Sequence, residues 1–116
     1  ETDLLWFSGD DVLNLAFLAL GATGIVSVVG HVAGDDYRAM IDAVDAGDLP
    51  RAREIHTRLI PAVDAIMHTS QGAIQVKAAL KEAGLIGSDR LRMPLLQGPP
   101  EHRAKLRDGL AAAGLG

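Results

Sequence analysis

The sequence predicts an α/β fold that continues into a purely helical C-terminal part. Two short apolar runs, residues 4–8 and 24–29, have the length and the β-branched or aromatic side chains of buried strands. The apolar segment between them, residues 12–20, is long enough for a helix. Strand, helix and strand at this spacing form a βαβ unit with parallel strands and a right-handed crossover. The pattern after Gly34 indicates helices only.

The βαβ unit has clear boundaries. Its first strand ends at Gly9, and Asp10 or Asp11 can accept the first free N–H groups of the helix that follows. Gly21 is the expected end of that helix. Because almost every position of the helix is apolar, it has to be covered on more than one side. Two strands do not form a stable sheet on their own, so we expect neighbouring strands from elsewhere.

Two helices follow the second strand. The first is expected to begin at a capping aspartate, Asp35 or Asp36, and to end near Gly47. Asp48 is the expected cap of the next helix, whose apolar residues recur at helical spacing toward residue 68. Pro61 lies inside this pattern and predicts a kink, because proline lacks the N–H group that a helix needs.

The remainder of the chain predicts two more helices and one irregular connection. A helix over residues 73–83 stops at Gly84. Prolines 94, 99 and 100 mark the connection, and residues 101–113 form the last helix. We therefore divide the chain into residues 1–47, which hold two βα units, and residues 48–116, a helical subdomain.

The composition is that of a globular chain with a single core. Of its 116 residues, 48% are apolar and 22% are charged, and the formal net charge is −4. The basic residues are scattered, which argues against nucleic acid as a partner. The apolar runs are too short to span a bilayer, which argues against a membrane protein. The absence of cysteine excludes disulfides and zinc–cysteine sites, and a cytoplasmic location is expected.

The histidines and one lysine are weak candidates for chemistry. His31, His56, His68 and His102 lack the i, i+4 pairing and the HExxH motif of zinc sites, so we predict no metal. His31 is the most interesting of them because it follows a predicted strand. Lys77 lies in a mainly apolar segment, where a buried lysine can form a Schiff base. The wet face of an amphipathic helix is the commoner place for such a lysine.

Asp10 and Asp11 are the stronger candidates. Adjacent carboxylates at a strand end can position a substrate amine or act as acid and base. They can also cap the next helix, and spacing alone favours capping. Ser8 lacks a nearby histidine base and an elbow motif, so it is not an expected nucleophile. The glycine-rich residues 21–24 follow a helix and precede a strand, the reverse of a dinucleotide-binding turn, and indicate a tight turn.

Two motifs carry a resemblance to a known family. Ser8-Gly9-Asp10-Asp11 and Gly21-Ala22-Thr23-Gly24-Ile25-Val26-Ser27-Val28 resemble barrel strands seven and eight of the dihydrodipicolinate synthase family. The likeness continues through residues 47–53, 74–80 and 91–95 and covers nearly the whole chain. It implies the C-terminal part of a TIM (β/α)8 barrel followed by an α-helical C-terminal subdomain. Since such a barrel has roughly 250 residues, we expect the chain, which opens without an initiator methionine, to be part of a larger protein.

The resemblance implies a class I lyase of lysine and diaminopimelate biosynthesis. In that family pyruvate forms a Schiff base with a lysine and then adds to aspartate semialdehyde, and no separate cofactor is needed. The lysine, a proton-relaying tyrosine and the threonines that hold pyruvate belong to earlier strands. We therefore expect no catalytic residue in this chain, no activity from it alone, and a missing N-terminal barrel portion as its partner. The resemblance also implies a homotetramer.

Four residues of this chain take site roles by resemblance. Val26 is expected to contact pyruvate through its backbone, and Gly9 to let the backbone approach the substrate. Asp10 and Asp11 are expected at the pocket entrance. The sequence departs from the family pattern at residues 72–75, where many members carry prolines, and this leaves the start of that helix open.

Two alternatives stay open. The same barrel can serve another pyruvate-dependent aldolase that takes a sugar-derived aldehyde. The chain can also be a non-catalytic helical interaction module whose exposed apolar strands drive self-association.

Overall fold

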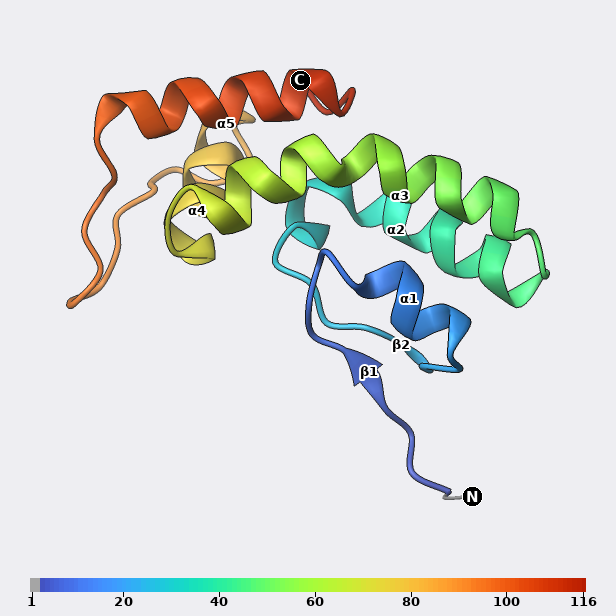
Figure 1. Cartoon of the computed structure of the whole chain (residues 1–116). Coiled ribbons are helices and arrows are strands. Elements are labelled where there is room, and N and C mark those ends of the chain that lie inside the picture. Colours follow the sequence, from blue (N-terminus) through green and yellow to red (C-terminus); the bar gives the residue numbers. More distant parts are fainter. Residues whose placement is uncertain (1–2) are drawn as a thin grey trace.

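A parallel two-stranded sheet lies at one side of a group of helices (Figure 1). The structure, a computed structural model, describes residues 3–116 of the chain. Strand β1 (Phe7–Ser8) pairs with strand β2 (Gly24–Ile25), and Ser8 lies opposite Ile25. Both strands fall within the predicted runs, and a helix connects them. The predicted parallel βαβ unit is therefore confirmed.

The strands are shorter and less buried than the sequence predicts. Leu5 is 74% exposed, Phe7 52% and Val26 70%. Within residues 3–116 the sheet consists of two strands, so each is an edge strand. The prediction of fully buried strands is wrong for this chain by itself, because strands of this composition need neighbours on both sides.

Helix α1 (Asn14–Ala19) makes the crossover from β1 to β2. It ends as predicted before Gly21, whose φ of 98° suits glycine and few other residues. The predicted cap by Asp10 or Asp11 is wrong, because α1 has no side-chain cap. The Asp10 carboxylate instead accepts the N–H of Val12 at 3.0 Å in the turn before the helix.

Helix α2 (Gly30–Asp45) begins more than a turn earlier than predicted. A kink at Ala33, with φ −127° and ψ 30°, separates its first residues from the remainder. The prediction that Asp35 or Asp36 starts this helix is therefore wrong, and Asp36 instead pairs with Arg58 of the next helix. The early start is possible because acceptors from outside the helix satisfy its first N–H groups, as described below.

Helix α3 (Leu49–Val63) passes directly into the π-helix η1 (Asp64–His68). Asp48 caps α3 as predicted, since its carboxylate accepts the Arg51 N–H at 3.0 Å. Pro61 lies inside α3, where we expected a kink. The hydrogen-bonding pattern changes from α-helical to π-helical three residues after Pro61, at the start of η1.

Replacing Asp48 with alanine is expected to lower the free energy of unfolding by about 1 kcal/mol, because the Arg51 N–H loses its acceptor. Urea unfolding followed by circular dichroism measures this change. Asp45→Ala is the matched control, since a carboxylate at the C-terminal end of α2 opposes the helix dipole. Equal losses in both variants would contradict the capping role.

Helices α4 (Gly72–Glu82) and α5 (Pro100–Ala112) match the last two predicted helices to within about a residue at each end. The start of α4, open in the sequence, is capped by the Gln71 side chain, which accepts the Ala73 N–H at 2.8 Å. Gly84 follows α4 with a φ of 72°. The connection between the helices is irregular, as predicted. No helix within residues 3–116 is long and apolar enough to cross a membrane.

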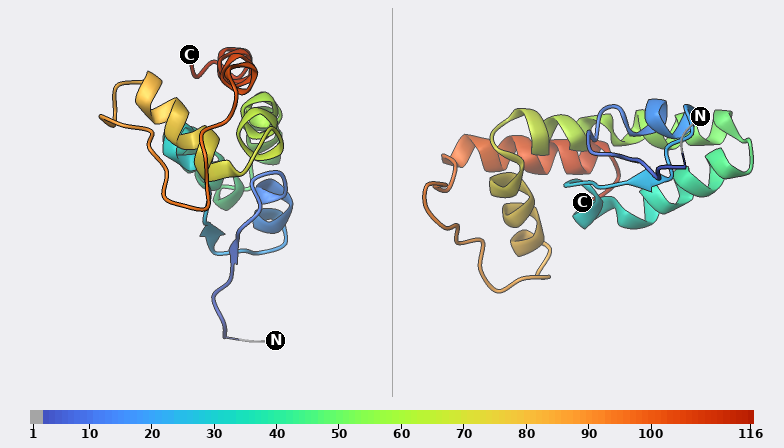
Figure 2. Two further views of the ribbon diagram at one scale, coloured as in Figure 1. Left: turned by 90° about the vertical axis from the view of Figure 1, so that its left-hand side faces the viewer. Right: turned by 90° about the horizontal axis from the view of Figure 1, so that it is seen from below.

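One apolar core runs through both parts of the chain. Helix α3 lies between α2 and α5 in Figure 1, and Figure 2 shows α5 beside α3 from two further directions. The core includes Met40 of α2, Ile55 and Leu59 of α3, and Leu106 of α5, each at most 1% exposed. Arg58 ties the far end of α5 to α3 by donating to the Ala113 carbonyl at 2.7 Å. The division into residues 1–47 and 48–116 stays a prediction.

Candidate functional site

The carboxyl ends of β1 and β2 lie at the same edge of the sheet, because the strands are parallel. Gly9 and Asp10 follow β1 and are exposed, and Val26 follows β2 and is 70% exposed. The Val26 N–H donates to the Ser8 carbonyl at 2.7 Å, which holds the two strand ends together. Three of the four residues that the sequence assigns to the site therefore share one exposed edge.

Asp11, the fourth residue, is 3% exposed and is surrounded by donors. Its Oδ1 accepts hydrogen bonds from the Ser27 hydroxyl and from Asn14 Nδ2, the latter at 3.2 Å. Its Oδ2 accepts the N–H groups of Val28 at 3.1 Å and Val29 at 3.2 Å. A buried carboxylate needs such donors, and a negative charge is favourable at the start of a helix. Asp11 therefore joins the end of β1 to the beginning of α2.

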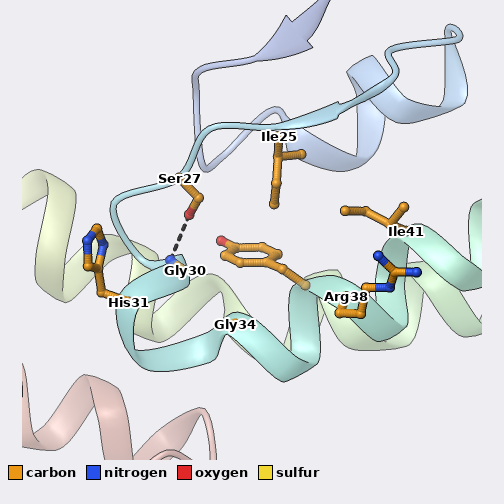
Figure 3. A pocket seen from close by; sticks show the side chains of 8 residues that line it. Ile25, Ser27, Gly30, His31, Gly34, Arg38 and Ile41 are labelled. Atoms are coloured by element: carbon orange, nitrogen blue, oxygen red, sulfur yellow. Dashed lines mark hydrogen bonds between the residues drawn. The ribbon is translucent and has the colours of Figure 1, made fainter. Parts of the chain in front are cut away.

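The network continues on both sides of Asp11. The Ser27 hydroxyl accepts the Gly30 N–H at 2.7 Å, the contact drawn in Figure 3. The Ser8 hydroxyl donates to Asn14 Oδ1 at 2.7 Å. Ser8 is 1% exposed and Asn14 is fully buried. These side chains link β1, α1, the end of β2 and the start of α2.

Tyr37 of α2 packs against this network. It is 3% exposed, and its hydroxyl is buried without a hydrogen-bond partner in the described residues. Burial raises the pKa of the Tyr37 phenol, and the nearby Asp11 carboxylate raises it further. Both effects disfavour the charged phenolate, so Tyr37 remains protonated in the folded chain.

Tyr37 is expected to ionise only when the chain unfolds. Since its folded pKa lies above the ordinary value of 10.0, its contribution to stability is complete below about pH 10 and is lost as the pH rises further. The chain has a single tyrosine, so tyrosinate absorbance reports on Tyr37 alone. A spectrophotometric pH titration, with circular dichroism on the same samples, checks this. Tyrosinate that forms in the folded chain at the same pH as in urea would contradict it.

An open hollow of about 370 Å³ lies between the end of β2 and α2 (Figure 3). Ile25, Ser27 and Gly30 form one wall, and Arg38 and Ile41 form another. Arg38 pairs with Asp42 at 3.0 Å on the surface. The walls are mainly apolar. They also include His31 and Tyr37, but neither a lysine nor a carboxylate of the described residues. Because these walls have no lysine, they offer no amine for Schiff-base chemistry.

The lysine and the histidines considered in the sequence either lie away from this edge or contact residues close to them in the chain. Lys77 of α4 is partly exposed, and its Nζ donates to the Arg90 carbonyl in the connection after the helix. His31 Nδ1 lies 3.0 Å from the Val28 carbonyl, and His68 Nδ1 lies 2.9 Å from an Asp64 oxygen.

Burial lowers the pKa of His56, which favours its neutral form. Within residues 3–116 no group of three or more histidine, aspartate or glutamate side chains is placed to hold a metal ion.

Three network residues were missed by the sequence reasoning, namely Asn14, Ser27 and Tyr37. Asn14 carried a usable signal, because it is a polar residue within an almost wholly apolar helix. Ser27 and Tyr37 carried none, since serine and tyrosine are ordinary at a strand end and on a helix.

Comparison with known proteins identifies the family. The model of the dihydrodipicolinate synthetase family matches residues 1–113. The 4-hydroxy-tetrahydrodipicolinate synthase of Kineococcus radiotolerans is 57% identical over 115 residues, which are 99% of this chain and 37% of that protein. The 4-hydroxy-tetrahydrodipicolinate synthase 2 of Streptomyces coelicolor is 47% identical over 115 residues, which are 99% of this chain and 38% of that protein. The chain thus spans well under half the length of these relatives.

Solved structures agree in fold. Dihydrodipicolinate synthase from Thermotoga maritima has a TM-score of 0.91 and 33% identity, and covers 97% of this chain with 38% of its own. The enzyme from Aquifex aeolicus has a TM-score of 0.90 and 35% identity, and covers 99% of this chain with 39% of its own. The resemblance drawn from the strand motifs is confirmed, as is the α/β class. The chain belongs to the dihydrodipicolinate synthetase family.

Proposed function

We propose that the chain is the C-terminal part of a 4-hydroxy-tetrahydrodipicolinate synthase-type lyase, which joins pyruvate to aspartate semialdehyde in lysine and diaminopimelate biosynthesis. The observation that carries the proposal is the 57% identity over 99% of the chain to 37% of a relative with that name. In this proposal β1 and β2 are the last two strands of a (β/α)8 barrel. The remaining strands of the barrel then cover the apolar side chains that are exposed here, such as Leu5 and Phe7.

The chemistry divides between the two parts of the enzyme. A lysine in the remaining part attacks the pyruvate carbonyl, and loss of water gives the Schiff base. Loss of a methyl proton gives an enamine, whose carbon adds to the aldehyde of the second substrate. No separate cofactor takes part. Barrel sites lie at the C-terminal ends of the strands, which is where Gly9, Asp10 and Val26 share an edge.

This chain then supplies part of the pocket wall. Val26 contacts pyruvate through its backbone, and Gly9, without a side chain, lets the backbone approach the substrate. A Cβ placed on Gly9 meets no atom within 4 Å in the described chain, so the space in front of Gly9 is open. Asp10 is exposed beside it, at the mouth. A homotetramer and a cytoplasmic location complete the proposal.

The complete protein tests the proposal. Incubation with pyruvate and reduction with borohydride are expected to add one pyruvate-derived group, found by intact mass spectrometry, to a lysine outside these 116 residues. Aspartate semialdehyde is expected to be consumed in preference to sugar-derived aldehydes. A pyruvate adduct with preference for a sugar-derived aldehyde would favour another aldolase of the same barrel. A complete protein that forms no adduct would overturn the proposal.

The exposed apolar strands favour one second candidate, a helical interaction module without chemistry. Its signature is concentration-dependent association of the complete protein in analytical ultracentrifugation, together with no binding of pyruvate.

A further inference from the structure

We propose that Asp11 is a positioning residue, whose buried carboxylate fixes the backbone after β2 so that Val26 is presented to pyruvate. The inference rests on the proposed function, because it assigns a role within that pyruvate pocket. Asp11 touches no reacting atom in this role and acts through residues 26–29.

The contacts of Asp11 carry the inference. Its two oxygens accept from Ser27 and Asn14 on one side and from the Val28 and Val29 N–H groups on the other, at 3.1 and 3.2 Å for the two backbone donors. An N-cap role would need a hydrogen bond from a backbone N–H of α1 to the Asp11 carboxylate. Asp11 makes no such bond, and its one contact with the start of α1 is with the Asn14 side chain. The other three of its four donors lie 16 to 18 residues away, just after β2.

The segment held in this way directly follows Val26. The Val26 N–H is itself bonded to the Ser8 carbonyl at 2.7 Å, so the residue is held by β1 before it and by Asp11 after it. Residues 26–29 belong to neither a strand nor a helix, so no regular pattern of backbone hydrogen bonds holds them. Instead, the Asp11 carboxylate accepts the N–H groups of Val28 and Val29, and the Ser27 hydroxyl accepts that of Gly30.

Among the described residues, no second charged group contacts the Asp11 carboxylate. The groups that face the carboxylate are Ser27, Asn14, two backbone N–H groups and the protonated Tyr37. All of them are neutral, so the negative charge is balanced by directed donors rather than by an ion pair. Directed donors of this kind favour one backbone geometry, which is what a positioning role needs.

The test uses Asp11→Asn in the complete protein. This change keeps the shape of the side chain but turns an –NH₂ group toward N–H or O–H donors. The KM for pyruvate is expected to rise roughly ten- to a hundredfold, while the KM for the aldehyde and the site of the borohydride-trapped adduct stay unchanged. Ser27→Ala, which removes one of the four donors, is expected to raise the pyruvate KM about three- to tenfold. Ser27→Thr, which keeps the hydroxyl, is expected to restore it.

Gln75→Glu is the matched control for a purely structural effect. Gln75 is 1% exposed, and its Nε2 donates to the carbonyls of Ala65 and His102, away from the strand ends. Like Asp11→Asn, this variant changes one buried side chain between an amide and a carboxyl group of the same shape. It is expected to lower the melting temperature and leave the pyruvate KM unchanged.

The outcomes separate the two proposals. A wild-type protein that traps no pyruvate overturns the proposed function and this inference with it. A wild-type protein that traps pyruvate, with folded Asp11→Asn and Ser27→Ala variants of unchanged pyruvate KM, overturns only the positioning role. An equal rise of the pyruvate KM in Gln75→Glu also overturns it. If Asp11→Asn does not fold, the Ser27→Ala and Ser27→Thr pair decides.

Discussion

The 116-residue chain, mixed with pyruvate and reduced with borohydride, is expected to gain no pyruvate adduct. A Schiff base needs a lysine amine at the pocket. The lysines of the chain are Lys77, Lys81 and Lys105, all on α4 or α5 and none at the ends of β1 and β2. The amines of Lys77 and Lys81 already donate to carbonyls of the connection after α4. The effect is all or none, because the covalent step has no nucleophile here.

Intact mass spectrometry of the chain after reduction measures this result. The complete protein, treated in parallel, is the positive control and is expected to carry the adduct. An adduct on the isolated chain would contradict the prediction. Peptide mapping and the Lys77→Met variant would then show whether Lys77 had formed it.

Replacing Gly109 with alanine is expected to lower the melting temperature by roughly 5 to 15 °C. Gly109 lies in α5 where this helix crosses α3 and η1. A Cβ at this position would come within 2.5 Å of the Ala65 Cβ and 2.6 Å of the Pro61 carbonyl oxygen. Neither atom belongs to a flexible side-chain end, so α5 has to move away from the core. The loss of packing around Leu106, which is fully buried, then outweighs the gain in helix propensity of about 1 kcal/mol.

Gly34→Ala is the matched control for this substitution. Gly34 is also inside a helix, but a Cβ there meets no atom within 4 Å. The variant is expected to leave the melting temperature unchanged or raise it slightly, because alanine favours the helix. Thermal unfolding by circular dichroism compares the two. A higher melting temperature for Gly109→Ala would show that α5 is not held close to α3.

The sequence predicts a helix end correctly where a capping residue or a glycine next to that end determines it. Asp48 caps α3, and Gly21 and Gly84 follow helix ends with positive φ, because capping and left-handed turns depend on neighbouring residues only. The strand motifs around Gly9 and Val26 were likewise enough to indicate the family, which the comparisons confirm.

The predictions from sequence were wrong or incomplete where a contact between distant residues determines the structure. It placed the start of α2 at Asp35 or Asp36, whereas the helix begins at Gly30 because Asp11 and Ser27 bind the N–H groups at its start. It could not tell which of two adjacent aspartates is buried. Asp10 bonds within its own turn, and Asp11 bonds across 17 residues to Val28.

By itself the sequence determined the order and ends of the later helices, the parallel βαβ unit and the family, since these depend on periodicity, caps and motif spacing. Only the tertiary structure decided that Asp11 faces the interior, that Tyr37 packs against it, and that Gly109 lets α5 approach α3. The physical reason is that desolvation and close packing depend on atoms brought together from distant parts of the chain, which no local pattern specifies.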